Sequence, residues 1–487
     1  MRTNNKLNFV LFIVILTSVL LNYFIFPNML YTQLFTAFFL VIAYLKFSNT
    51  PKMMIYYSTL LLSIVNFSMV IPITSQYSIY YFYVTLFIYA AAYALYYFRN
   101  IKTFDIKAIL KNKYIIFLIV FLCYMVITTF IAADKKLAIK YIYNYIIMAL
   151  LAMMIFVENN TISKLKNTLK YLLYIYGGIL FTGLLQIAGI TCELRNHFEE
   201  WDPESFAQLP YVNKIPVTFF YNPNNYAVFL VLSMTVLMVA YLYTKNKKEK
   251  TVLSIFYLIS LINLIFTRSR TAWASLFLII VFCIAIYLIK ERRNIINVKR
   301  LTGIFIASLM VFFVLSTVPA MEPFYGKLAT TSIFHFFGSS KNKQPVLIIG
   351  NKGSDAERYT LAYDVIHGIF KDKNYFGFGP GNVEKYVEKM NNTYGVLNVH
   401  SLWLEMLGDF GIIFFIYFLI IFLYVIKENV FVSYSEEERG GQFFTTSAAL
   451  FFGLVFLSFA PSSIMWYTPF WITIGIAYRT ASMRTEE

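Results

Sequence analysis

The 487-residue chain has little charge. Asp, Glu, Lys and Arg make up 14% of its residues, against about 25% in ordinary globular domains. Hydrophobic residues account for 59% and aromatic residues for 19%. A soluble protein of this composition could not cover its surface with polar groups, whereas repeated runs of about 20 apolar residues can each cross a bilayer. The composition excludes a soluble domain and predicts an all-α, polytopic membrane protein.

Cysteine and histidine are also scarce. The three cysteines are scattered: Cys123, Cys192 and Cys283. Their spacing excludes a disulfide framework and a cysteine metal site. The four histidines are His197, His335, His367 and His400. They form no His/Asp/Glu cluster, so neither a metal nor a cofactor is expected. The net charge of +16 is assigned to basic loops that orient the spans, and not to nucleic acid.

Hydropathy predicts about fourteen membrane spans, the first of which is a retained span and not a cleaved signal peptide. They lie near 8–26, 30–47, 53–72, 78–98, 114–133, 143–157, 168–190, 226–244, 251–267, 272–289, 301–319, 402–426, 443–459 and 463–480. Alternate loops on one side, together with Lys170 just inside a span, hold 25 of the 41 Lys and Arg residues. The positive-inside rule makes that side cytoplasmic, so both termini are expected inside the cell and the membrane is expected to be the cytoplasmic one.

Two long outer loops stand out, because long loops in a compact protein usually have a function. The loop of about 320–399 is the one segment large enough for an extracytoplasmic subdomain, and short helices are expected in it. The second loop, 191–225, is acidic and ends in the sequence from Phe220 to Asn225, which includes Asn222 and Asn224.

Arg268 and Arg270 separate two apolar runs at a predicted outer turn. Arginine beside a span either snorkels to the interface or marks a site. A guanidinium group also matches phosphate oxygens in a bidentate manner. Both side chains face one ligand if the turn is extended, whereas in a helix they lie about 200° apart. The two interpretations, interface anchor and anion clamp, both remain open.

Residues 354–370 mix apolar and charged positions in a pattern typical of a helix lying on the membrane surface. Arg358 near its start is either a surface cation or a group that points into the site, and His367 is interpreted as a packed residue. The following turn carries Gly377, Gly379 and Gly381. Its amides could face a phosphate, although the pattern alone does not identify a nucleotide site.

His400 lies where the polar loop meets the apolar run from Leu402. If the helix already runs at His400, Asp409 lies on its opposite face and Glu405 about 140° away, which argues against a His–Asp dyad. A lone imidazole at the water boundary, with a pKa near 6.5, suits proton abstraction from a hydroxyl. The alternative is a histidine that caps the helix or anchors it at the interface.

These motifs resemble those of a known family. His400 and Ser401, followed after nine residues by Gly411, are similar to the His-[Asn/Ser/Gln]-x9-Gly signature of the bacterial O-antigen ligase/polymerase family (the WaaL and Wzy types). The upstream order agrees over about 215–415: Asn222, Pro223 and Asn224, then Ser269 and Arg270, then Arg358, then Gly377, Gly379 and Gly381. Asp409 replaces the family's usual Glu, and Phe414 replaces the Gly, Thr or Tyr that often ends the ligase signature.

The resemblance implies a GT-C-like integral-membrane glycosyltransferase that inverts the anomeric carbon without a metal. Its donor would be an oligosaccharide on undecaprenyl diphosphate and its acceptor a second glycan; a flippase and a chain-length regulator are further expected partners. Arg268, Arg270 and Arg358 would bind the diphosphate and His400 would act on the acceptor hydroxyl. Asn222, Asn224, Ser401, Gly379 and Gly411 would support the site.

The expected organisation has four parts. Residues 1–225 form an N-terminal bundle with the outer loop 191–225, and 226–319 form central helices. Residues 320–400 form the extracytoplasmic catalytic loop, and 401–487 the C-terminal helices. The departures from the ligase signature favour a polymerase of a surface polysaccharide (capsule, O-antigen or teichuronic type) over a ligase. A transporter of lipid-linked oligosaccharide is the alternative from another class, but it should place ionisable residues near the midplane of several spans.

Overall fold

The computed structural model describes residues 2–72, 78–99, 112–201, 203–290, 295–318, 321–323, 349–351, 354–431, 434–461 and 465–485. Within these ranges a long helix overlaps each of the fourteen predicted spans, and nine spans are long and apolar enough to cross a membrane. The chain is therefore an all-α, multi-pass membrane protein, as predicted. The long helices are α1 (Arg2–Leu21), α2 (Leu30–Ile42), α3 (Pro51–Ile64), α4 (Tyr81–Arg99), α6 (Lys113–Thr129), α7 (Lys135–Glu158), α8 (Ile162–Ile187), α11 (Pro223–Tyr243), α12 (Lys247–Phe266), α13 (Arg270–Lys290), α14 (Ile295–Ser316), α19 (Leu402–Val430), α20 (Tyr434–Leu457) and α21 (Thr468–Thr485).

Shorter elements occupy the connections. They are η1 (Asn22–Phe24), η2 (Pro27–Met29), η3 (Ala43–Phe47), η4 (Asn66–Ser68), β1 (Val70–Pro72), β2 (Ser78–Tyr80), α9 (His197–Trp201), α10 (Pro203–Gln208), η6 (Val212–Lys214), η7 (Thr218–Phe220), α17 (Ser354–Phe370) and α18 (Val383–Met390). Strands β1 and β2 form an antiparallel hairpin that the sequence did not predict. The predicted span 53–72 is consequently shorter, because α3 ends at Ile64 and the polar residues Asn66 and Ser68 take up a 3₁₀ turn.

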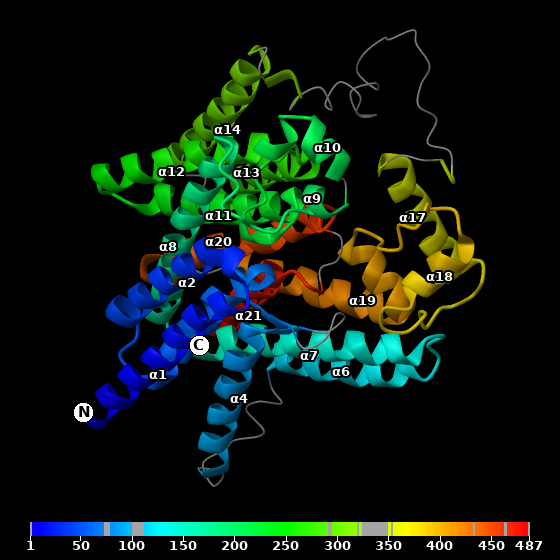
Figure 1. Ribbon diagram of the computed structural model, residues 1–487, viewed down its shortest axis with the longest axis horizontal. Helices are drawn as coiled ribbons and strands as arrows, with labels where there is room; N and C mark the ends of the chain where they lie inside the picture. The colour runs from blue at the N-terminus through cyan, green and yellow to red at the C-terminus, as the bar shows by residue number, and fades with distance from the viewer. Residues whose placement is uncertain are drawn as a thin grey trace.

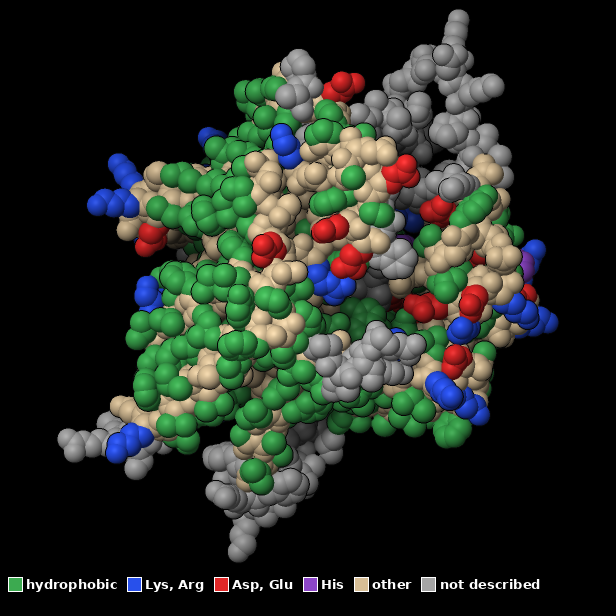
Figure 2. All heavy atoms as spheres, in the orientation of Figure 1, with side chains coloured by type: hydrophobic (Ala, Val, Ile, Leu, Met, Phe, Trp, Pro, Cys, Tyr) green, Lys and Arg blue, Asp and Glu red, His purple; other side chains and the backbone are tan. Residues whose placement is uncertain are grey.

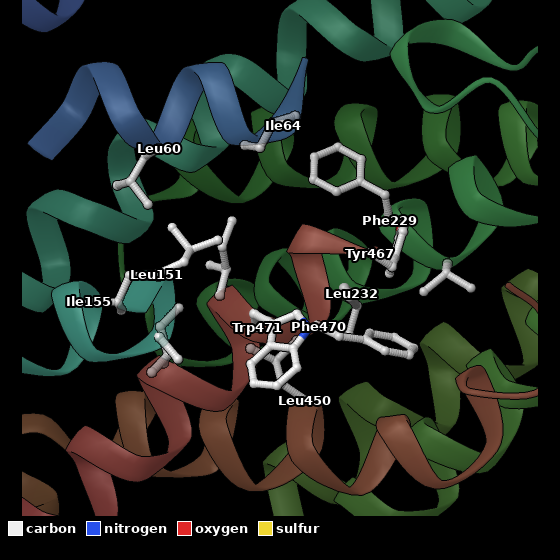
Figure 3. Close-up of a cluster of buried hydrophobic side chains, with 14 of the residues drawn as sticks. Leu60, Ile64, Leu151, Ile155, Phe229, Leu232, Leu450, Tyr467, Phe470 and Trp471 are labelled. Carbon is white, nitrogen blue, oxygen red and sulfur yellow. The ribbon is translucent and has the colours of Figure 1, made fainter. Parts of the chain in front are cut away.

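The core lies where α3, α7, α11, α20 and α21 meet (Figure 3). Its labelled side chains are Leu60, Ile64, Leu151, Ile155, Phe229, Leu232, Leu450, Tyr467, Phe470 and Trp471. Helix α21 approaches α7 closely at Gly475, where an added Cβ would lie 2.7 Å from the carbonyl oxygen of Ala152. The C-terminal helix is therefore a central part of the bundle.

Loops predicted to lie on the same side of the membrane contact one another. On the predicted outer side the Asp134 amide donates to Asn382 Oδ1 at 2.7 Å. On the other side Asn112 Nδ2 donates to Ser482 Oγ at 2.9 Å. Figure 1 shows α17 and α18 at the right edge, far from the N-terminus, and in Figure 2 acidic side chains gather in that half of the molecule while hydrophobic side chains cover much of the rest. The bundle thus has two distinct ends.

Candidate active site

His400 lies at the junction between the outer subdomain and α19. On one side, Val399 is buried with residues of α17 and α18. On the other side, the Ser401 side chain caps α19 by accepting a hydrogen bond from the Leu404 amide at 3.4 Å. His400 itself has φ +52°, a left-handed conformation that histidine adopts more readily than most residues. The helix therefore begins two residues after His400, which lies in a fixed turn.

The imidazole of His400 contacts the turn that joins α20 to α21. The carbonyl of Pro461 accepts a hydrogen bond from the ring, and Nδ1 is buried with no hydrogen-bond partner among the described residues. Burial, and then the positive charge of Arg358, lower the pKa of His400 to about 4. The expected pKa near 6.5 is therefore wrong for the unliganded protein, in which the imidazole is neutral at pH 7.

Arg358 reaches the same turn from α17. Its Nη1 donates to the carbonyl oxygen of Phe459 at 3.3 Å, two residues before the carbonyl that His400 contacts. The turn, 458–461, is itself fixed because Trp403 Nε1 donates to the Val455 carbonyl at 3.0 Å. This bond ties the first turn of α19 to the last turn of α20. The structure thus brings Arg358 and His400 together on one short segment of backbone.

Arg270 opens α13, which runs antiparallel to α20. Phe282 stacks on Phe452 with ring centroids 3.9 Å apart, and an added Cβ on Gly453 would lie 2.8 Å from Ile279. Arg270 precedes Ile279 by nine residues, or ~13 Å at 1.5 Å per residue. The end of α20 at Leu457 follows Gly453 by four residues, or ~6 Å in the same direction. This register places the start of α13 at the same end of the bundle as the turn that holds His400 and Arg358.

Arg268 takes a different direction. It has φ +59° in the turn between α12 and α13, and its guanidinium lies 5.1 Å from the ring centre of Tyr211 in the loop of α10 and η6. Its Nε is buried without a hydrogen-bond partner among the described residues. The contact described for Arg268 is therefore with the outer loop and not with His400.

Asn222 and Asn224 form the start of α11. The Asn222 side chain accepts a hydrogen bond from the Asn224 amide at 2.8 Å and caps the helix. The next residue, Asn225, accepts a hydrogen bond from the Tyr467 hydroxyl through its carbonyl at 2.6 Å. Because Tyr467 precedes α21, this bond ties the asparagine turn to the segment after Pro461. Asn222 and Asn224 therefore belong to the same end of the bundle and have a structural role there.

The amides of the glycine-rich turn donate hydrogen bonds to other protein groups, so they are not free to bind an anion. The amides of Phe378 and Gly379 donate to the carbonyls of Gly408 and Asp409 at 2.8 and 2.9 Å. The amides of Gly381 and Val383 donate to the Asp409 carboxylate at 2.7 and 3.0 Å. The suggestion that this turn offers its amides to a phosphate is therefore wrong. Its conformation instead clamps the outer subdomain onto α19.

Gly411 breaks α19 at the position where this clamp acts. Its φ of +71° and ψ of −179° are not helical, and the following amide, of Ile412, donates to the Tyr375 carbonyl at 3.0 Å instead of to its own helix. Asp409 meanwhile faces the turn and not His400, in agreement with the prediction that the two form no dyad. Gly377 and Gly411 permit this close approach, because a Cβ on either would lie 2.5 Å from the amide nitrogen of the other. Gly379 instead lies against the end of α6, where an added Cβ would be 2.9 Å from the Thr128 carbonyl oxygen.

Helix α17 packs against protein along the stripe that was predicted to contact membrane. Leu361, Val365 and Ile369 are fully buried, and the first two form a small core with residues of α18 and with Val399. The membrane-surface interpretation is therefore wrong for this face, because α18 and Val399 of the same chain cover it. His367 is half-buried and lies 3.8 Å from Asp372, so it is a packed residue, as predicted.

Sequence reasoning missed the polar contacts that join α7 to the site region. The Tyr141 hydroxyl donates to Glu384 of α18, and burial raises the pKa of that carboxyl group. The ammonium group of Lys140 lies 5.8 Å from the ring centre of Trp466. The excess of lysine at the start of α7 was visible in the sequence, but its partners are more than 240 positions away. No group of three or more His, Cys, Asp or Glu residues in the described part of the chain is placed to hold a metal ion.

Comparisons with known proteins agree with this geometry. Residues 255–419 match the family model described as O-antigen ligase, and this segment contains Arg268, Arg270, Arg358, His400 and Gly411. The chain is also 24% identical over 294 residues to the teichuronic acid biosynthesis protein TuaE of Bacillus subtilis (strain 168). The match covers 60% of this chain and 56% of that protein, so the chain spans about half the length of this relative. The segment that runs from α12 into α19 is therefore similar to the O-antigen ligase family.

Proposed function

We propose that the chain is a membrane glycosyltransferase that joins oligosaccharide repeats, carried on undecaprenyl diphosphate, into a surface polysaccharide. The observation that supports this most directly is the meeting of the His400 imidazole and the Arg358 guanidinium on the 458–461 turn. A base beside a cation is the arrangement that glycosyl transfer from a diphosphate needs. The family match supplies the reaction class.

His400 acts on the acceptor. Its neutral imidazole takes the proton from an acceptor sugar hydroxyl as the hydroxyl oxygen attacks the anomeric carbon of the donor. The bond between that carbon and the diphosphate oxygen breaks on the opposite face, which inverts the configuration. Undecaprenyl diphosphate leaves with the bonding electron pair. The reaction needs no metal, because the arginines provide the positive charge.

Arg358 and Arg270 act on the leaving group. Negative charge grows on the diphosphate as the glycosidic bond breaks, and fixed guanidinium groups stabilise it most in a site from which water is excluded. The bound diphosphate also offsets the Arg358 charge that holds the pKa of His400 down. Donor binding therefore makes the imidazole a better base. Arg268, held over Tyr211, lies further out and is assigned to the saccharide part of the donor.

The site faces the outside of the cytoplasmic membrane and both termini lie in the cytoplasm. The distribution of lysine and arginine supports this orientation, and a flippase would supply the donor on that side. Single cysteines at Tyr394, which is 61% exposed, and at exposed Lys248 test it after the three native cysteines are replaced. An impermeant maleimide should label the first position in intact cells and the second only after lysis. The reverse pattern would overturn the orientation.

The activity is tested with purified protein and one lipid-linked repeat. A ladder of products on a gel supports a polymerase, whereas a single transfer to a separate acceptor supports a ligase. His400→Ala is expected to lower the rate by about 10²–10⁴-fold, the range of general base catalysis, and Arg358→Gln should act on both kcat and KM. His367→Gln is the matched control, because His367 lies in the same subdomain outside the site. Equal activity of His400→Ala and His367→Gln would refute the proposal, and transport without any transfer would indicate a flippase.

A further inference from the structure

A second site lies at the opposite end of the bundle from His400, between α11, α12 and α14. It is a cavity of about 360 Å³, within the range of about 300–1,000 Å³ that is usual for ligand pockets. Apolar side chains form most of its wall, and the residues that line it are Leu237, Met238, Tyr241, Leu253, Ser254, Tyr257, Leu258, Leu261, Arg300, Gly303, Ile304, Ala307 and Val311. An apolar cavity of this kind stays dry and accepts apolar ligands.

The cavity is built between helices that are joined at two levels. At its polar end, Arg300 Nη1 donates to the Leu242 carbonyl at 3.2 Å. Deeper in the bundle, the Tyr257 hydroxyl bonds to Ser308 Oγ at 3.1 Å. Leu258 on its wall is 46% exposed, so the cavity reaches the outer surface of the bundle. Only 11% of the membrane span of α14 is buried, so most of this helix lies on the outer surface of the bundle.

Positive charge gathers at one end. The acceptors of Arg300 are a carbonyl and the Asn297 side chain, which are both neutral. The half-buried ammonium group of Lys250 lies 5.7 Å from the ring centre of Tyr241, which lines the cavity. The nearby carboxylate of Glu249 accepts a hydrogen bond from Thr244. A ligand that fits this site has an apolar chain and an anionic head.

The length of the site defines the chain that it accepts. From Arg300 to Val311 the helix rises ~16 Å at 1.5 Å per residue, which is about half of the ~30 Å hydrocarbon core. This is the depth of one leaflet. An acyl chain of a phospholipid matches it, whereas an undecaprenyl chain is much longer. We propose that this groove binds one acyl chain of an anionic phospholipid, whose phosphate lies between Arg300 and Lys250, and that the lipid supplies contacts that α14 lacks.

Gly303 allows a clean test, because a Cβ added there meets no atom within 4 Å. Gly303→Leu fills the groove and replaces a poor helix former with a good one, so folding is not at risk. Arg300→Gln removes the charge and keeps a donor, and exposed Lys299→Gln is its charge-matched control. Full-length protein in detergent is incubated with phosphatidylglycerol or phosphatidylethanolamine of identical chains, and bound lipid is counted by native mass spectrometry.

The unsubstituted protein should retain phosphatidylglycerol at least threefold over phosphatidylethanolamine. Arg300→Gln should lower phosphatidylglycerol retention to the phosphatidylethanolamine level, Lys299→Gln should leave it unchanged, and Gly303→Leu should lower retention of both lipids severalfold. Undiminished retention by Gly303→Leu would overturn the site. A preference for undecaprenyl phosphate over phosphatidylglycerol in competition would overturn the assignment of the ligand. Neither result bears on the transferase proposal, because the two sites lie at opposite ends.

Discussion

Replacing Gly411 with alanine should separate the outer subdomain from α19. The backbone at Gly411 has φ +71° and ψ −179°, a region that is essentially restricted to glycine and costs other residues about 1–3 kcal/mol. An added Cβ would also lie 2.1 Å from the carbonyl oxygen of Tyr375 and 2.5 Å from the amide nitrogen of Gly377. These are backbone atoms, so they cannot rotate away as a side chain can.

Relief of this overlap requires the turn to move away from the helix. The bond from the Ile412 amide to the Tyr375 carbonyl is then lost, and each buried backbone group left without a partner costs about 1–3 kcal/mol. Together with the backbone strain, this should lower the free energy of unfolding of Gly411→Ala by about 4 kcal/mol. The activity should fall with it, because Val399 and His400 follow directly from the subdomain that is displaced.

Gly395→Ala is the matched control. Gly395 also has a positive φ, +84°, but a Cβ there meets nothing within 4 Å, so only the left-handed backbone cost of about 1–2 kcal/mol applies. Both variants are purified in one detergent and their apparent Tm is compared. At about 2 °C per kcal/mol, Gly411→Ala should melt at least ~4 °C below Gly395→Ala. Equal shifts would show that the packing at Gly411 contributes nothing, and the clamp would be refuted.

Three further outcomes are expected. The Asp409 carboxylate accepts hydrogen bonds from two backbone amides. Asp409→Asn points an NH₂ group at one of them and should lower the free energy of unfolding by about 2–3 kcal/mol, seen as a lower apparent Tm. Because the pKa of His400 is lowered to about 4 in the folded protein, the unfolded chain binds more protons than the folded one between about pH 4 and 6.5, and the free energy of unfolding should fall as the pH drops through that window. His400→Gln should remove this pH dependence of stability. In the free enzyme, kcat/KM should be lost near pH 4 and not near 6.5. Leu361→Ala, in the subdomain core, should lower the free energy of unfolding by about 2–5 kcal/mol, whereas Tyr359→Phe on the exposed face should lower it by under about 0.5 kcal/mol. Similar protease sensitivity of the two variants would contradict the packing of α17.

The membrane spans could be predicted from sequence because hydropathy is a local property. Each predicted span overlaps a helix, and in two cases loops predicted to share a side contact each other. The order of motifs also placed His400 and Arg358 correctly at one end. What could not be predicted depends on partners far along the chain. The apolar stripe of α17 was visible, for example, but the sequence could not say whether protein or lipid covers it.

The same limit explains the errors at the site. The spacing of Gly377, Gly379 and Gly381 predicted a tight turn, but the groups that its amides bind belong to α19, about 30 positions away. The pKa of His400 depends on its burial and on Arg358, and neither is a property of the local sequence. The break at Gly411 was likewise hidden, because the residues around it, Glu405 and Asp409 included, read as the start of one membrane span.

The break in α19 has a consequence for biogenesis. Within hydrocarbon every peptide group must find a partner. Here the Gly408 carbonyl of the span accepts a hydrogen bond from the Phe378 amide of the outer turn, and the Tyr375 carbonyl of the turn accepts one from the Ile412 amide of the span. The glycine turn precedes α19 in the chain, so it is synthesised before the span. The break is favourable only while the turn is docked, because without it the Gly408 carbonyl and the Ile412 amide would face lipid unpaired. Docking of the outer subdomain is therefore coupled to the insertion of α19 in its broken form.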